Sequence, residues 1–275
     1  MSEPVPGTDG GRAPARVAVR VADIAGGVAL AAMLATPFSP RGGRMRRVLA
    51  WATVAAGATR SVAVDVERAG GTRAALVRAG ATNLLVASIG GAVESVGVRT
   101  GRPFGRYAYT GVLRPTLAGV PVLVPMAWIA MSGPAHGMAG AIVPDVSSAT
   151  GGARPLERIV LGSGALAAWD LFLDPQMTAE GYWQWDRPGR YRGIPAANFL
   201  GWLGVGVLIM SVRELLLGDR SAGQDADDRH LVTYGVVGAL ETIAFATFFR
   251  DRLVATVGGL PMLTATIAAV RRSRG

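Results

Sequence analysis

Residues 195–217 read PAANFLGWLGVGVLIMSVRELLL, a run in which almost every position is apolar or small. At about 1.5 Å of rise per helical residue, a run of this length crosses a hydrocarbon core of about 30 Å. Backbone polar groups in lipid must be paired within the segment, and the alternating pattern of a barrel strand is missing from this stretch. The run is therefore predicted to be a transmembrane helix.

Seven further apolar stretches of similar length accompany this one. We place them at 18–36, 46–65, 75–96, 115–133, 156–173, 231–249 and 253–270. Residues 1–16 are rich in Pro, Gly and charge and are predicted to be a disordered tail, followed by a single transmembrane domain over 17–275. Segment 218–230 is interpreted as an exposed connector. The sequence thus predicts an all-α, polytopic transmembrane helical bundle of seven to eight spans, integral to a bacterial-type cell membrane.

The composition agrees with a membrane location. Half of the 275 residues are hydrophobic and 17% are charged, against about 25% charged residues in an average soluble domain. The net charge of +9 lies in short arginine clusters between apolar runs. We therefore expect membrane lipids around the chain and no nucleic-acid partner.

Several kinds of catalytic site are excluded by the residue inventory. The chain has no cysteine, so thiol catalysis and Cys-bound metals are ruled out. Its two histidines, His136 and His230, are both expected in loops. Neither a histidine metal site nor a Ser-His-Asp triad is predicted.

Loops 37–45, 97–114, 174–194 and 250–252 follow the odd-numbered spans and therefore share one side of the membrane. The first three hold the densest arginine clusters, so the positive-inside rule makes this side cytoplasmic. The C-terminal RRSRG favours the opposite orientation if all eight segments cross.

Ionisable side chains within spans cost about 2.5–3.5 kcal/mol each on insertion scales, so each one needs a partner or a function. Asp23, Arg60 and Arg78 fall within spans on the side opposite the arginine-rich loops. We expect these three side chains to pair with one another as a structural cluster.

Four acidic residues lie within or at the ends of spans that run in one direction. Glu94, Asp170 and Asp174 fall near the arginine-rich side, and Asp170 and Asp174 share a helical face because they are four residues apart. We expect these three carboxyl groups to converge at one depth, with Glu241 deeper at the floor. A structural alternative pairs the acids with loop arginines, namely Arg99, Arg102, Arg106 or Arg190.

Aromatic side chains gather at the same end of the predicted bundle. They are Phe104, Tyr107, Tyr109, Trp169, Phe172, Tyr182, Trp183, Trp185 and Tyr191. An interfacial belt of Trp and Tyr would explain such residues at span ends. A belt is expected at both membrane faces, however, and the opposite span ends are poor in aromatics. The asymmetry favours a ring-lined cavity.

Three blocks carry a resemblance to a known family. They are ESVGVRTGRPFGRYAYTGVLRPTLAGVPVLVPMAWIAM at 94–131, AWDLFLDPQMTAEGYWQWD at 168–186 and GRYRGIPAANFLGWLGVGVL at 189–208. Together they resemble the carotenoid biosynthesis membrane family of the bisanhydrobacterioruberin hydratase and lycopene 1,2-hydratase type. The resemblance implies an enzyme without cofactor or metal that adds water to the terminal double bond of an acyclic carotenoid. The implied substrate is dissolved in the bilayer, and other carotenoid biosynthesis enzymes could be partners.

Hydration of this kind starts with protonation of the alkene and ends with capture of a tertiary carbocation by water. A carboxylic acid in apolar surroundings keeps its proton near pH 7. We expect Asp170 or Glu94 to be the acid and Asp174 to position the water. Aromatic faces would stabilise the cation by about 0.5–2 kcal/mol each. The residues expected to bind substrate are Arg106, Tyr107, Tyr109, Trp169, Trp183, Trp185, Asn198 and Glu241.

Two alternative functions stay open. The Asp170–Asp174 pair and the loop arginines are similar to the magnesium diphosphate site of a membrane prenyltransferase acting on a polyprenyl or carotenoid substrate, although a second Asp-rich motif is missing. The other alternative is a non-enzymatic polyene-binding or transport protein with Glu241 in a charged pathway. A transporter would be expected to show internal symmetry, and none is evident.

Overall fold

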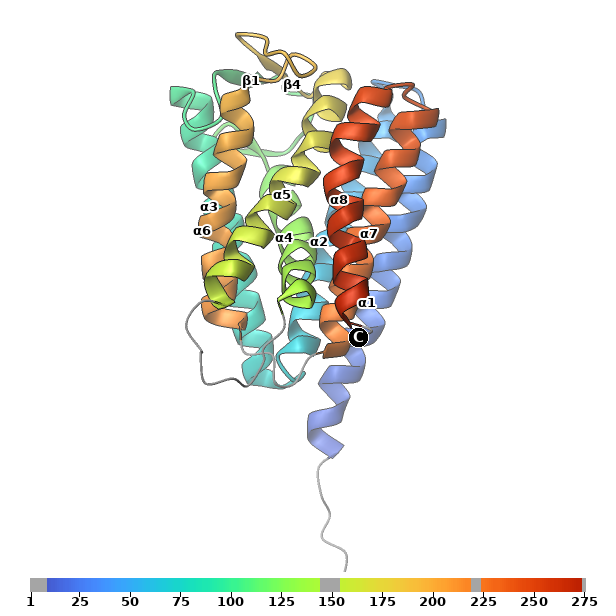
Figure 1. The fold of residues 1–275 in the computed structure, drawn as a ribbon, viewed down its shortest axis with the longest axis vertical. Coiled ribbons are helices and arrows are strands. Elements are labelled where there is room, and N and C mark those ends of the chain that lie inside the picture. Colours follow the sequence, from blue (N-terminus) through green and yellow to red (C-terminus); the bar gives the residue numbers. More distant parts are fainter. Residues whose placement is uncertain (1–8, 144–153, 219–223, 274–275) are drawn as a thin grey trace, which may run out of the picture.

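Eight long helices run side by side in the structure, a computed structural model that describes residues 9–143, 154–218 and 224–273 (Figure 1). They are α1 (Asp9–Ala35), α2 (Arg44–Arg68), α3 (Arg73–Thr100), α4 (Leu123–Ile142), α5 (Arg154–Ala179), α6 (Ala196–Leu217), α7 (Gln224–Thr247) and α8 (Arg252–Ser273), with the short 3-10 helix η1 (Thr36–Phe38) after α1. The predicted all-α transmembrane bundle is confirmed, and the chain is an integral membrane protein.

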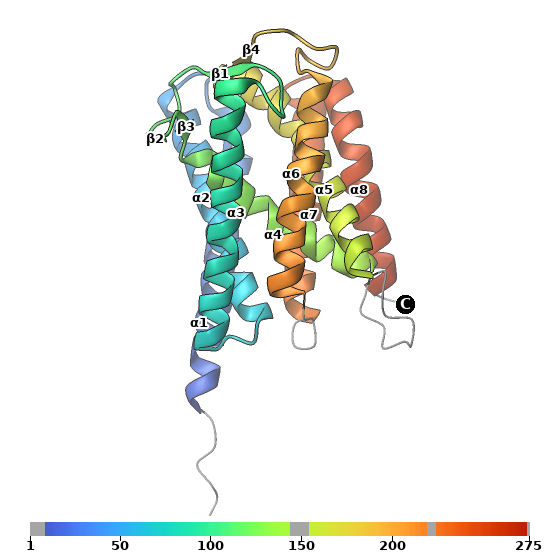
Figure 2. The ribbon, with the colours of Figure 1, turned by 90° about the vertical axis from the view of Figure 1, so that its left-hand side faces the viewer.

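Helix α4 occupies the middle of the bundle. It packs against α2, α3, α5, α6, α7 and α8, and every residue from Met131 to Gly140 is buried (Figures 1 and 2). Five other helices, α1, α3, α6, α7 and α8, contain windows apolar enough to cross a membrane by length and composition. Helices α2 and α5 carry buried ionisable side chains, which lower their hydropathy.

The predicted span 115–133 is wrong at both ends. Residues before Leu123 form a small hairpin, in which β2 (Thr116–Leu117) pairs antiparallel with β3 (Val120–Pro121). The turn between the strands uses Ala118 and Gly119, both at positive φ, a conformation that glycine adopts without cost. Apolar composition alone does not distinguish this hairpin from the start of a helix. Helix α4 consequently begins later and extends to Ile142.

Both histidines lie in helices, which corrects their predicted position in loops. The later end of α4 places His136 inside that helix, where it is fully buried. Helix α7 starts at Gln224, so His230 is helical and buried rather than part of an exposed connector. At the other end of the chain, α1 begins at Asp9 and includes residues 9–16 of the predicted disordered tail, while residues 1–8 lie outside the described residues.

A buried polar cluster ties the helices together at the end where α2 finishes and α3 begins. The Oδ1 atom of Asp65 accepts from Arg213 Nη2 at 2.6 Å and lies 3.1 Å from His230 Nε2, and its Oδ2 accepts from Asn83 at 2.8 Å. All four side chains are buried. A charge pair without access to water needs such additional hydrogen bonds to offset its desolvation. The cluster thereby fixes α2, α3, α6 and α7 relative to one another.

The expected cluster of Asp23, Arg60 and Arg78 forms only in part, because Asp23 and Arg60 attract each other electrostatically but find their hydrogen-bond partners elsewhere. Asp23 on α1 accepts a hydrogen bond of 2.5 Å from Arg229 on α7. Arg60 donates from Nε to Thr233 Oγ1 at 2.9 Å, and Arg78 lies on the exposed face of α3. The sequence does not reveal this arrangement because the partners come from α7, whose first turns were assigned to a connector.

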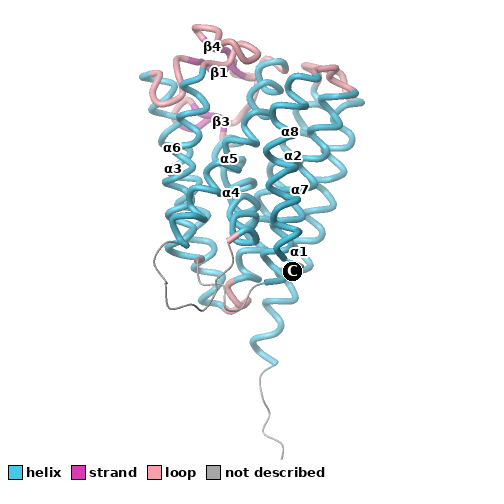
Figure 3. The backbone as a smooth tube through the Cα atoms, viewed as in Figure 1, coloured by secondary structure: helices cyan, strands magenta, loops and turns pink. Residues whose placement is uncertain are grey.

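A two-stranded sheet closes the end of the bundle where α3 and α5 finish (Figure 3). Strand β1 (Tyr107–Tyr109) pairs antiparallel with β4 (Trp183–Trp185), so that Tyr107 lies opposite Trp185 and Tyr109 opposite Trp183. Side chains two apart in a strand point to the same face. The sheet therefore aligns two tyrosines and two tryptophans beside the ends of α3 and α5.

Candidate active site

Glu94 lies on α3 below the sheet, and two tyrosine hydroxyls converge on it. Tyr107 and Tyr109 both donate to Oε2 of Glu94, the latter at 2.8 Å. The alternation of side chains along β1 places both hydroxyls on the same side. Gly97, one turn further along α3, leaves room for this approach, because a Cβ at that position would lie 3.0 Å from the Tyr107 hydroxyl.

Both tyrosines remain hydrogen-bond donors over the ordinary pH range. Burial raises the pKa of Tyr107 and Tyr109 well above the usual tyrosine value, and the nearby Glu94 carboxylate raises them further. The phenols consequently stay neutral. Glu94 thus has neutral donors rather than a cation as its hydrogen-bond partners.

Asp170 and Asp174 are joined by a single amide. They lie one turn apart on α5, and Nδ2 of Asn198, in the first turn of α6, donates to both carboxylates, to Asp170 Oδ2 at 2.7 Å. Asp170, Asp174 and Asn198 are all buried. An amide nitrogen has two hydrogens, so one asparagine satisfies one oxygen on each acid. The alternative in which the acids pair with loop arginines is wrong, since these three acids accept hydrogen bonds from Tyr and Asn side chains.

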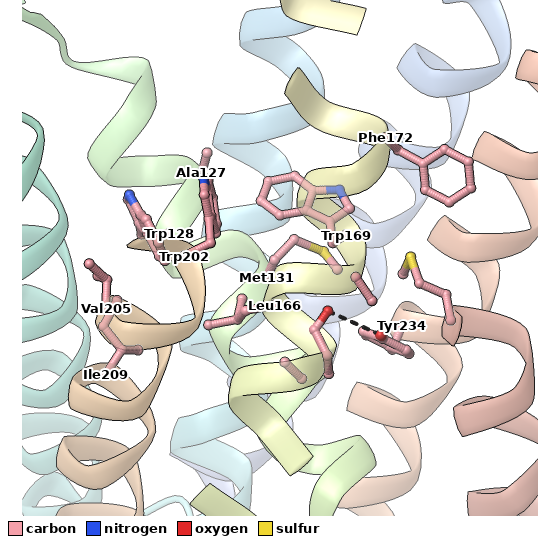
Figure 4. Packing of buried hydrophobic residues seen from close by; sticks show 14 of the residues in the cluster. Ala127, Trp128, Met131, Leu166, Trp169, Phe172, Trp202, Val205, Ile209 and Tyr234 are labelled. Carbon is pink, nitrogen blue, oxygen red and sulfur yellow. Dashed lines mark hydrogen bonds between the residues drawn. The ribbon is translucent and has the colours of Figure 1, made fainter. Parts of the chain in front are cut away.

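A ladder of three tryptophans packs beside the acids. Trp128 on α4 stacks on Trp202 on α6 with centroids 3.9 Å apart, and Trp202 meets Trp169 on α5 edge to face at 6.0 Å (Figure 4). Trp128 and Trp202 were not among the predicted site residues, although Trp128 lies in the 94–131 block and Trp202 in the 189–208 block. Gly90 on α3 makes room for this ladder, because a Cβ there would lie 2.4 Å from the Trp128 ring.

One cavity of about 600 Å³ brings most of the predicted site residues together. Its lining includes nine of the eleven predicted site residues, namely Glu94, Asp174, Tyr107, Tyr109, Trp169, Trp183, Trp185, Asn198 and Glu241. Asp170 is buried behind this lining and reaches it through Asn198. Arg106 is exposed and does not line the cavity. Glu94 and Asp174 therefore converge on the cavity as expected. Asp170 is connected to the cavity only through the Asn198 amide.

The walls of this cavity are mostly apolar and aromatic, although Asp23, Arg46, Arg60 and Glu180 also contribute to the lining. Tyr109 packs edge to face on Trp183 with centroids 5.8 Å apart, and Tyr107 packs against Trp185 at 5.1 Å. The carboxyl groups of Glu94 and Asp174 thus face a space whose surface is mostly carbon. Within the described residues, no group of three or more His, Asp or Glu side chains is arranged to hold a metal ion.

Comparisons with known proteins agree with the sequence resemblance. The model of a family described as "Carotenoid biosynthesis protein" matches residues 42–267. Bisanhydrobacterioruberin hydratase from Haloarcula japonica is 32% identical over 112 residues, which cover 40% of this chain and 36% of the relative. The match therefore spans about a third of the length of that relative. No solved structure matches this chain.

Proposed function

Because the chain belongs to the carotenoid biosynthesis protein family, we propose that it is a cofactor-independent hydratase that adds water to the terminal double bond of an acyclic carotenoid. The observation that carries this proposal is the position of Glu94 and Asp174 at one end of an apolar cavity, with neutral hydrogen-bond partners. The protein would act in a bacterial-type cell membrane on substrate dissolved in the bilayer.

The proton donor is Asp174 in this account. Asp170 and Asp174 meet on one amide, and two buried carboxyl groups without a cation between them resist joint ionisation, so a proton is retained by the pair. Asp174 faces the cavity, whereas Asp170 does not. The lining therefore favours Asp174 or Glu94 over Asp170 as the acid, and Asp170 becomes a positioning residue that acts through Asn198.

Glu94 is suited to hold the attacking water. Two tyrosine hydroxyls donate to its Oε2 atom, and these hydrogen bonds offset part of the cost of ionising a buried carboxyl group. The Oε1 atom can then accept a hydrogen bond from water. We propose that Glu94 orients this water and takes up the proton that the water loses.

The reaction balances without any redox partner. The Asp174 proton is transferred to the less substituted carbon of the terminal double bond, which leaves a tertiary carbocation on the neighbouring carbon. The oxygen of the bound water forms a bond to that carbon and releases its proton to Glu94. Return of this proton to Asp174 through solvent or the buried network restores the enzyme, and the net change is addition of one water.

The aromatic walls stabilise the intermediate. A cation over a Trp or Tyr face gains about 0.5–2 kcal/mol, and Trp169, Trp183, Tyr107 and Tyr109 surround the carboxyl groups. The same walls exclude bulk water, which limits competing loss of the acid proton. Glu241 would contact the remainder of the substrate, whereas Asn198 and Trp185 lie at the end that holds the carboxyl groups.

Expression of the chain in a lycopene-producing bacterium, followed by mass analysis of the pigments, tests the proposal. A gain of one or two waters per carotenoid is expected. A gain of isoprenyl units would replace the hydratase with a prenyltransferase. Unchanged pigment that copurifies with correctly inserted protein would indicate a polyene-binding protein instead.

A further inference from the structure

The cavity extends far beyond the two carboxyl groups. On the α1 side, its lining runs from Asp23 to Phe38 in η1. At about 1.5 Å of rise per residue, this distance is about 22 Å along the helix axis. The carboxyl groups occupy one end of this space, so most of its length has no part in the proton transfer described above.

Helices α1 and α7 border the cavity without packing along each other. Helix α1 packs along α2, and α7 packs on α4, α8 and α2, whereas α1 and α7 are not among the closely packed pairs. A contact lies at each end of this gap, one between α1 and α7 and one between η1 and the residue that follows α7. Asp23 accepts from Arg229 at 2.5 Å at one end, and the Phe38 and Phe248 rings meet edge to face at 5.2 Å at the other.

The side chains between these two contacts face both the cavity and the outside. Five of these side chains line the cavity and are still 40–58% exposed, namely Leu30 and Leu34 on α1 and Val232, Val236 and Ile243 on α7. Among the described residues, every large apolar side chain that is both exposed and cavity-lining belongs to α1, η1, α7 or Phe248. The cavity therefore opens into the bilayer along this gap.

From this geometry we propose that the gap between α1 and α7 is a lateral entrance and holding groove for the polyene chain. The inference rests on the proposed function. A polyene in the bilayer would enter this gap laterally and place its end group at Glu94 and Asp174. The part of the gap that is lined by aliphatic side chains of α1 and α7 is called the slot. Because the slot is open along its length, the rest of the chain can stay in lipid. The Asp23–Arg229 and Phe38–Phe248 contacts bound the slot at its two ends.

Single cysteines test this entrance directly, because the chain contains no cysteine of its own. Leu34→Cys places a thiol in the slot, and Leu84→Cys places one on the lipid-facing side of α3, where Leu84 is 69% exposed and does not line the cavity. Each full-length variant is reconstituted in vesicles and treated with a lipid-soluble maleimide, with and without lycopene. At a lycopene concentration roughly ten times its Kd, labelling of Leu34→Cys should slow roughly tenfold, since a bound site is protected. Labelling of Leu84→Cys should not change.

The maleimide adduct supplies a second readout. Labelled Leu34→Cys should no longer convert lycopene to hydrated product, whereas labelled Leu84→Cys should keep its rate. The unlabelled form of each variant shows that the substitution itself leaves the protein folded. Equal labelling rates of Leu34→Cys with and without lycopene would overturn the entrance, as would unchanged conversion by the labelled variant. Protection is measured without any chemical turnover, so failure of the hydratase proposal alone would leave protection at Leu34→Cys intact.

A pair of glycines offers an independent steric test. Gly27 on α1 lines the cavity, and a Cβ added there would meet nothing within 4 Å. The same open surroundings are found at Gly80 on α3, away from the cavity. Gly27→Trp should therefore fill the slot and reduce the lycopene that copurifies with the protein, whereas Gly80→Trp should retain it. Equal pigment retention by the two variants would contradict the groove.

Discussion

Asn198 donates a hydrogen bond of 2.7 Å to Asp170 across the interface of α5 and α6, and the same amide nitrogen donates to Asp174. This relationship connects an acid at the cavity wall with an acid behind it. It also explains how two carboxyl groups one turn apart are accommodated without a positively charged partner. In the proposed mechanism, the amide holds both acids in place while Asp174 transfers the shared proton to the substrate.

Removal of that amide should therefore impair both folding and catalysis. Asn198→Leu leaves two buried carboxyl groups without their donor, and each unmet buried group costs about 1–3 kcal/mol. We expect a lower unfolding temperature in detergent together with reduced hydration. Asn83→Leu is the matched control, because Asn83 donates to Asp65 at 2.8 Å in the other buried cluster. The control should lose stability but keep its conversion rate per folded molecule; equal catalytic loss in both variants would contradict a specific role for Asn198.

The two tyrosine hydroxyls should matter more than their rings. The double variant Tyr107→Phe/Tyr109→Phe keeps the aromatic wall but removes both donors to Glu94. A hydrogen bond to a charged group contributes about 1.5–3 kcal/mol, so a loss of roughly tenfold or more in hydration is expected, measured as product formed per folded protein. Tyr191→Phe serves as control, since the Tyr191 hydroxyl donates to the Leu171 carbonyl instead. An active double variant would remove these hydroxyls from the mechanism.

Tyrosine ionisation should not limit activity at alkaline pH. The pKa of Tyr107 and of Tyr109 is raised above the model-peptide value of 10.0 by burial and by Glu94. A raised pKa keeps the phenol neutral to higher pH, so both donors persist as the pH passes through 10.0. A pH profile of hydration in vesicles with equal pH on both sides checks this expectation. A fall in wild-type activity near pH 10 that is absent from Tyr107→Phe/Tyr109→Phe would show that these tyrosines ionise normally.

Two glycines on α3 should respond oppositely to the same substitution. A Cβ at Gly90 would lie 2.4 Å from the Trp128 ring, which is itself stacked on Trp202. Gly90→Ala should therefore destabilise the protein by about 1–3 kcal/mol through overpacking. Gly80→Ala meets nothing within 4 Å and should stabilise the helix by about 0.5–1 kcal/mol. Thermal unfolding of both variants in one detergent measures the difference, and a Gly90→Ala protein as stable as Gly80→Ala would contradict the packing of Trp128.

Most of the helical bundle could be predicted because lipid-crossing helices leave a strong signal of length and hydropathy. The span predicted at 195–217 coincides closely with α6, Ala196–Leu217. The helix prediction fails where apolar residues form a structure other than a helix. Residues 115–122 are apolar enough for a helix but form a hairpin. The first turns of α7 are polar, and for that reason residues up to His230 were assigned to a connector.

Only part of the candidate site could be predicted from the sequence. The four-residue spacing of Asp170 and Asp174 indicated a shared face, and the common direction of their helices indicated convergence with Glu94. The hydrogen bonds of these acids could not be predicted, because Asn198 and Tyr109 reach them from separate elements, α6 and β1, whose placement depends on the tertiary fold. Strands of three residues, such as Trp183–Trp185, are also too short to show a periodic pattern.

In the proposed mechanism, Asp174 protonates the substrate and water supplies the hydroxyl oxygen. Wild-type protein and Asp174→Asn are reconstituted with lycopene in water enriched in oxygen-18, with Asp186→Asn, an exposed residue of the sheet loop, as control. Loss of a general acid costs roughly 10²–10⁴-fold in rate. Mass spectrometry should find the heavy oxygen in the alcohol formed by wild type and by Asp186→Asn, and almost no alcohol from Asp174→Asn. Unlabelled alcohol from wild type, or equal labelled product from Asp174→Asn, would contradict the account.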